Sequence, residues 1–176
     1  MISLDRRQLV AITKFCDSSK LCSGISYLGN AIEACNGPIA IRVQLVVNGI
    51  KEEKIRIPKT ALLAAIAAMD KDDVAIISAD NIKVDRIHIG FEPLEQLFFE
   101  DLTPVFNGIK DGFPDRFIMF DGTLQNKINA ALSAFGIYKE KEYGTKEKVL
   151  CISGQCEFYE VQVAIAGINL KDSEDA

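Results

Sequence analysis

The sequence of 176 residues lacks any apolar run of about 18 residues, the length that a membrane-spanning helix needs. Its first seven residues lack the apolar core of a signal peptide, so we expect no membrane insertion, no export and a cytoplasmic location. It also lacks an excess of positive charge, because 20 Lys and Arg stand against 25 Asp and Glu, a net charge of −5. Composition therefore gives no argument for a broad basic surface, although a ring or groove can be basic inside and acidic outside.

Residues suited to catalysis or metal binding are scarce. The five cysteines form no C-x-x-C pair, and His88 is the only histidine, so we expect reduced, mostly buried cysteines and no metal site. Cys151 and Cys156 flank a predicted turn and are candidates to face each other across two strands. No glycine-rich phosphate-binding motif occurs, and the acidic groups are separated by loops. We expect no cofactor and no enzymatic activity, with His88 as a surface residue of a strand.

The apolar periodicity predicts a mixture of helices and antiparallel strands. Asp5 and Gln8 have the spacing of a capping box, which predicts a helix from that point to Cys16. Residues 39–47 alternate apolar and polar side chains as a half-buried strand does, and Asn48-Gly49 predicts a hairpin into the next strand. Further helices are predicted after Pro58 and after Asp121 or Thr123, with Gly136 as a stop.

Two parts of the sequence can be superimposed. Residues 74–79 correspond to 149–154, and residues 82–89 correspond to 156–163. The alternation slips by one residue at Asp85-Arg86, as at a β-bulge, and slips again at Tyr159-Glu160. A repeat of this length predicts modules that bury their apolar faces against one another. The expected class is an α+β fold of repeated β-α-β-β modules with antiparallel sheets.

The segment Ile55–Leu63, followed by residues 72–74 and 82–84, resembles the second half-domain of DNA sliding clamps, above all the bacterial polymerase III beta clamp. Phe113-Pro114 stands where that family often closes a domain. The resemblance covers most of the chain and implies a clamp-like domain at 1–115 and a further half-domain at 116–170. The terminal residues 171–176 are expected to form a disordered tail. Bacterial members have three full domains, so this chain would close a ring only by assembling as a homo-oligomer.

The resemblance implies a non-enzymatic processivity factor that encircles double-stranded DNA and docks protein partners. Clamp helices present cations to phosphates, and the candidates for DNA binding here lie off the apolar stripes of the three helices: Arg6, Arg7, Lys14, Lys59 and Lys127. The alanine-rich second helix fits close helix packing at least as well. An assembly module of the same fold without DNA contact is the alternative. Gln96-Leu97-Phe98-Phe99 also resembles a peptide that docks on clamps, as a client would carry.

Overall fold

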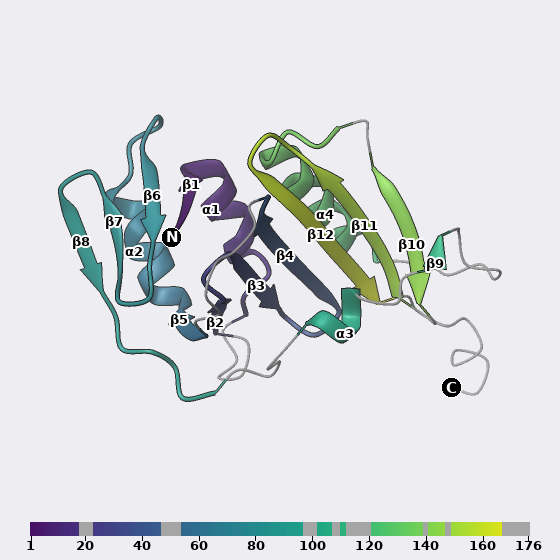
Figure 1. Ribbon diagram of the computed structural model, residues 1–176, viewed down its shortest axis with the longest axis horizontal. Coiled ribbons are helices and arrows are strands. Elements are labelled where there is room, and N and C mark those ends of the chain that lie inside the picture. Colours follow the sequence, from purple (N-terminus) through teal and green to yellow (C-terminus); the bar gives the residue numbers. More distant parts are fainter. Residues whose placement is uncertain are drawn as a thin grey trace.

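The computed structural model describes residues 1–17, 23–46, 54–96, 102–106, 110–111, 121–138, 141–146 and 149–166. Its main elements repeat in one order, a strand, a helix and three more strands, and we call each such group a module (Figure 1). Three modules follow one another along the chain. The predicted class, repeated α+β modules with antiparallel sheets, is confirmed, with one more strand in each module than expected.

Module 1 begins with a strand that the sequence analysis does not predict. Its elements are β1 (Ile2–Asp5), α1 (Arg6–Thr13), β2 (Gly24–Tyr27), β3 (Ala31–Cys35) and β4 (Ile39–Leu45). The capping box is confirmed, since Gln8 N donates to Asp5 Oδ1 at 2.8 Å and Asp5 N donates to Gln8 Oε1 at 3.0 Å. β3 is also missing from the prediction, because its five residues are all buried and show no alternation.

Module 2 corrects the predicted bulge. Its elements are β5 (Ile55–Pro58), α2 (Lys59–Ala68), β6 (Val74–Ile77), β7 (Asn81–Val84) and β8 (Ile87–Gly90). Val84 pairs with Ile87, so Asp85-Arg86 is the two-residue turn of a hairpin. Asp85 has a φ of 48°, in the left-handed region that such turns use. A tight turn and a bulge both displace the alternation by one residue, so the sequence pattern did not separate them.

Module 3 follows a connector that contains the short helix α3 (Thr103–Phe106). Its elements are β9 (Lys110–Asp111), α4 (Gly122–Ala134), β10 (Glu142–Lys146), β11 (Val149–Gln155) and β12 (Tyr159–Ala166). Asp121 caps α4, and Gly136, with a φ of 75°, follows its end, both as predicted. The strand predicted at 117–120 lies outside the described residues.

The predicted superposition of the modules is wrong by one strand. Counted from the helix, β6 corresponds to β10 and not to β11. Tyr159 and Glu160 lie inside the continuous strand β12, so no second slip exists there. Cys151 pairs with Ala164, and Cys156 lies in the turn between the strands, so the two thiols do not face each other. The repeat of elements is present, but its register is not the one that the sequence suggested.

Modules 1 and 2 exchange their first strands between two sheets. Sheet A has the order β1-β6-β7-β8, and sheet B has the order β5-β2-β3-β4-β12-β11-β10-β9. Thus β1 pairs with β6 of module 2, while β5 pairs with β2 of module 1. Since β5 and β4 are not neighbours, the hairpin predicted at Asn48-Gly49 is wrong, and its turn lies outside the described residues.

Sheet B continues without a break from module 1 into module 3. β4 and β12 pair antiparallel from Ile39 opposite Ile165 to Leu45 opposite Tyr159, and we call this pairing the seam. The Tyr159 hydroxyl donates to the carbonyl of Ser3 in β1, and the Tyr159 ring meets that of Phe135 edge-on at 5.8 Å. Burial raises the pKa of Tyr159 above its usual 10. Module 3 is therefore joined to module 1 by main chain and side chains together.

The helices share one apolar core with both sheets. α1 lies between α2 and α4 and packs against each of them (Figure 1). The fully buried side chains come from every layer and include Leu9, Ile12, Leu62, Ala131, Leu132, Ile41, Val43, Val161 and Val163. Burying a side chain of this size contributes about 1.5–3 kcal/mol, so the contact among the three helices is a main source of stability.

Leu102 and Phe106, in the connector between β8 and β9, pack against the other face of sheet B next to a buried ion pair. Arg42 Nε on β4 donates to Glu33 Oε1 on β3 at 2.7 Å. Glu33 Oε2 accepts from the main-chain N–H of Leu102 at 3.3 Å, and the Arg42 guanidinium lies 5.1 Å from the ring centre of Phe106. The expectation of a half-buried strand at 39–47 is corrected here, because this cover buries Arg42.

Small side chains make room for the connector. Cys35, Ala40, Ala164 and Cys151 stand opposite one another on four adjacent strands, β3, β4, β12 and β11. They form one buried cluster with Leu102 and Phe106. This row crosses the seam, so the connector bridges both modules. Cys16, Cys35 and Cys151 are buried and Cys156 is half-buried, all four outside any disulfide among the described residues, and Cys22 lies outside the described residues. The predicted domain limits at 1–115 and 116–170 stay predictions, and the tail at 171–176 lies outside the described residues.

Candidate nucleic-acid interface

The exposed side of α1 carries the densest group of predicted DNA-binding residues. Arg7 and Lys14 are seven residues apart and so lie on one side of the helix, with Val10 between them. Arg6 is exposed next to them. Leu9 and Ile12 hold the opposite side in the core. Arg7 reaches back to the carboxylate of Asp5 at 3.5 Å, but its side chain stays 81% exposed, so a phosphate can displace this weak contact.

Lys59 does not join this group. It is the first residue of α2 and is half-buried, and its Nζ donates to the carbonyl of Cys16 at 2.9 Å. The ammonium group of Lys59 thus holds the main chain of the segment that follows α1 through this hydrogen bond. The exposed side of α2 is formed by Thr60, Leu63, Ala64 and Ala67 and carries no charge. The prediction of Lys59 as a phosphate contact is weakened, because reaching outward would cost this hydrogen bond.

Lys127 lies on the flank of α4 and is half-buried. The exposed side of that helix is polar and uncharged, with Asn126, Asn129 and Ser133 at intervals of three and four residues. Asp121 at its N-cap accepts from Thr123 N at 2.7 Å and Leu124 N at 3.3 Å, and these N–H groups lower the pKa of its carboxyl. The structure thus places Arg6, Arg7 and Lys14 exposed along α1, whereas Lys59 is bonded to the Cys16 carbonyl and Lys127 lies half-buried on a different helix.

The three long helices contain no acidic residue. Within the described helices α1, α2 and α4, four residues are Lys or Arg and none is Asp or Glu, and a fifth cation, Lys14, directly follows the last residue of α1. The whole chain has 25 acidic residues against 20 basic ones. In the part of the chain that the structure describes, the acidic side chains therefore lie in strands, turns and connectors. This segregation is visible in the sequence once the helices are placed, but the sequence-based search for helix residues considered only Lys and Arg.

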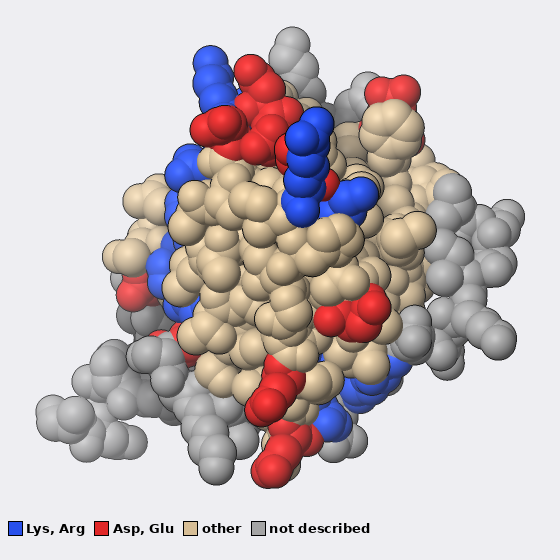
Figure 2. Space-filling view, turned by 90° about the vertical axis from the view of Figure 1, so that its left-hand side faces the viewer, with Lys and Arg blue, Asp and Glu red and all other residues tan. Residues whose placement is uncertain are grey.

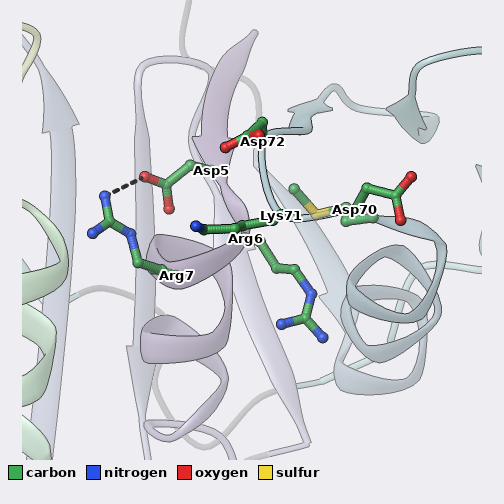
Figure 3. A pocket seen from close by; sticks show the side chains of 7 residues that line it. Asp5, Arg6, Arg7, Asp70, Lys71 and Asp72 are labelled. Atoms are coloured by element: carbon green, nitrogen blue, oxygen red, sulfur yellow. Dashed lines mark hydrogen bonds and ion pairs between the residues drawn. The ribbon is translucent and has the colours of Figure 1, made fainter.

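A mixed-charge pocket opens beside the first turn of α1. It has a volume of about 580 Å³ and is lined by residues from the end of β1, the start of α1 and the segment after α2: Asp5, Arg6, Arg7, Met69, Asp70, Lys71 and Asp72. Figure 3 shows Arg6, Arg7 and Lys71 among the three carboxylates. Equal numbers of cations and anions line this hollow. It is therefore no strong anion site by itself, and of the three basic residues of the interface only Lys14, at the other end of α1, does not line it.

One end of the molecule is largely uncharged. Figure 2 shows the end that carries β8 and α2, and charged side chains are sparse over its centre. Leu63 on α2 is 48% exposed and Ile87 on β8 is 50% exposed. β8 is the edge strand of sheet A, with a hydrogen-bonded neighbour on one side only among the described residues. An apolar helix face next to a strand edge suits contact with another protein surface.

The described residues offer little to bond-making chemistry. Among them, no three His, Cys, Asp or Glu side chains are grouped so as to hold a metal ion. His88 is exposed on β8, as predicted for a surface residue of a strand. No helix in the described part of the chain is long and apolar enough to cross a membrane.

In comparisons by sequence, no family model and no curated protein matches the chain. Comparison of structures finds the DNA polymerase III beta subunit of Thermotoga maritima, with a TM-score of 0.64 at 10% identity, over 96% of this chain and 64% of that chain. The chain has the sliding-clamp fold. The sliding clamp of Bartonella birtlesii matches with a TM-score of 0.60 at 12% identity, over 96% of this chain and 64% of that chain. The polymerase sliding clamp of Pseudomonas aeruginosa matches with a TM-score of 0.59 at 10% identity, over 99% of this chain and 66% of that chain.

The clamp fold confirms the architecture that the sequence resemblance implied. The chain spans less than two thirds of the length of the first two of these clamps. A shared fold does not by itself carry an activity, since function resides in the residues of a site. In this chain, the features from which a function can be argued are the basic side of α1, the acid-free helices and the sparsely charged end at β8 (Figure 2).

Proposed function

We propose that the chain is a clamp-like, non-enzymatic scaffold of the cytoplasm that holds double-stranded DNA against its helices, as a polymerase processivity factor does. The observation that carries this proposal is the complete exclusion of acidic residues from α1, α2 and α4 in a chain of net charge −5. A carboxylate facing the phosphate backbone would repel it, so a DNA-facing layer is selected to lack carboxylates even where it has few cations.

The contact with DNA is made chiefly by Arg6, Arg7 and Lys14 on α1. These side chains are exposed and lie close together on the middle helix of the three. Pairing with about three phosphates per chain gives weak binding that depends on salt and reads no base sequence. Weak contacts of this kind allow a scaffold to move along a duplex.

Assembly of several copies supplies a closed path around DNA. The uncharged end with Leu63 and Ile87 beside the free edge of β8 supports a homo-oligomer, because a sheet edge can pair with an edge of another copy.

The neutral side of α2 and the inward position of Lys59 favour a second candidate, an assembly module of this fold that binds protein and no DNA.

The deciding experiment measures oligomeric mass in solution and retention on nicked circular and linear duplexes of equal length. The proposal expects an oligomer that stays on the circle and slides off free ends. An oligomer that is retained on neither DNA supports the assembly module. A monomer without retention overturns both the ring and the scaffold.

A pair of matched variants tests the role of α1. R7A/K14A removes two exposed cations from α1, and K83A/R86A removes two exposed cations from β7 and the turn that follows it. The first should reduce the slope of log K against log salt by about 2, since each phosphate contact contributes about 0.9. The second should leave the slope unchanged. Equal effects of both variants would contradict a specific DNA-facing side.

A further inference from the structure

The exposed side of α4 carries a row of uncharged hydrogen-bond donors. Asn126, Asn129 and Ser133 are all exposed and lie on one side of the helix. The row continues in Tyr138, whose side chain is 67% exposed and whose hydroxyl lies 3.3 Å from Ser133 Oγ. Each asparagine amide has two N–H donors, and no described interaction within the protein uses them. The row therefore faces outward with free donors at Asn126 and Asn129.

The surroundings of this row favour an anionic partner, although the row itself has no charge. α4 packs against α1, the helix that carries the exposed Arg6, Arg7 and Lys14. α4 contains no acidic residue, and the nearby carboxylate of Asp121 is occupied by the first N–H groups of the helix. An anion held by α1 would thus meet donors and no competing carboxylate along the exposed side of α4.

We infer that Asn126 and Asn129 bind the phosphate backbone of double-stranded DNA next to the phosphates that pair with α1. This inference rests on the proposed function and adds a second, neutral contact line to it. Side-chain amides and hydroxyls regularly donate to phosphate oxygens and position a duplex without reading its sequence. Two helices that contact neighbouring phosphates would hold the duplex at a defined angle to the helix layer, which cations on one helix cannot do.

The neutral line has a signature that separates it from the basic one. A cation that pairs with a phosphate releases a condensed counterion, so its loss changes the salt dependence of binding. An amide releases none, and its loss lowers the affinity by the same factor at every salt concentration. One hydrogen bond corresponds to a factor of about 2–10, so losing two should weaken binding about 10-fold.

The test is a salt titration of binding to a fluorescein-labelled duplex of random sequence, followed by anisotropy from about 50 to 200 mM salt. N126A/N129A should give a line parallel to that of the unchanged protein and about 10-fold weaker. The matched control is Q155A/Q162A, which removes two amides from the outer face of sheet B, opposite α4. It should bind as the unchanged protein does. Alanine favours a helix more than asparagine does, so N126A/N129A keeps α4 folded, which a thermal melt verifies.

The other outcomes are equally decisive. Unchanged affinity of N126A/N129A, or a change in slope instead of a parallel shift, overturns the neutral contact line while leaving the role of α1 intact. Absence of binding by the unchanged protein at the lowest salt overturns the proposed function and this inference with it. As a second variant, N126R/N129R should bind more tightly with a slope steeper by about 2. A slope that does not change in this variant shows that the row faces away from DNA.

Discussion

The buried pair of Glu33 and Arg42 gives the sharpest prediction for stability. We expect Arg42→Met to lower the free energy of unfolding by about 3–5 kcal/mol, because it leaves the fully buried carboxylate of Glu33 without its cation. The remaining partner of that carboxylate is the N–H of Leu102 at 3.3 Å. Since a domain is typically stable by about 5–15 kcal/mol, this loss is a large fraction of the total.

Replacing both partners should do much less harm. Glu33→Met with Arg42→Met removes both charges and fills the space with apolar side chains, a change that is often neutral at buried pairs. The N–H of Leu102 then loses its acceptor, which costs about 1–3 kcal/mol. The double variant should therefore be more stable than Arg42→Met alone.

Urea unfolding followed by circular dichroism measures these free energies, and hydrogen exchange at the Leu102 amide reports on the connector. Exchange at Leu102 should accelerate in every variant that lacks the Glu33 carboxylate. The reasoning is refuted if Arg42→Met costs less than about 1 kcal/mol, or if the double variant costs as much as the two single changes added together.

Three further changes test other parts of the fold. Gly24→Ala should cost about 1–3 kcal/mol in urea unfolding, because a Cβ there would lie 2.3 Å from the Ile57 carbonyl and 2.7 Å from Leu94; a neutral result would contradict this packing. Tyr159→Phe should cost about 1 kcal/mol through its bond to Ser3. The raised pKa of Tyr159 means that the unfolded chain ionises first, so the unchanged protein should lose stability above about pH 10 more steeply than the variant. Asp121→Ala should lower the urea midpoint while Asp121→Asn retains it, and the difference between Asp121→Ala and the unchanged protein should shrink as the pH falls from 3.8 through the lowered pKa of the folded protein, because the carboxylate then loses its charge.

The elements that could be predicted from the sequence are those in which one face meets the core and the other meets water. The helix α1 with its Asp5–Gln8 capping box is of this kind. The strand at 39–45 was also found, although most of both its faces is covered, because the buried Arg42 and the half-buried Gln44 still alternate with apolar residues. β3 was missed because both its faces are covered, one by helices and one by the connector. That cover depends on residues about 70 positions further along the chain, such as Leu102, which no local pattern reveals.

The candidate site was predictable in part. The exposed position of Arg6, Arg7 and Lys14 follows from the periodicity of α1. The inward turn of Lys59 could not be predicted, because it depends on where the Cys16 carbonyl lies in three dimensions. The outer row of α4 was overlooked because a search for cations passes over asparagine.

The main-chain pairing of β4 with β12 across the seam helps to explain why this fold tolerates large changes of sequence. Seven successive residue pairs join β4 to β12, and the bonds between them are made by peptide groups that every residue type possesses. This pairing therefore does not depend on a particular set of side chains. Mutations can replace nearly all the surface and much of the interior while the pairing persists, and chains with about one residue in ten in common still share the fold.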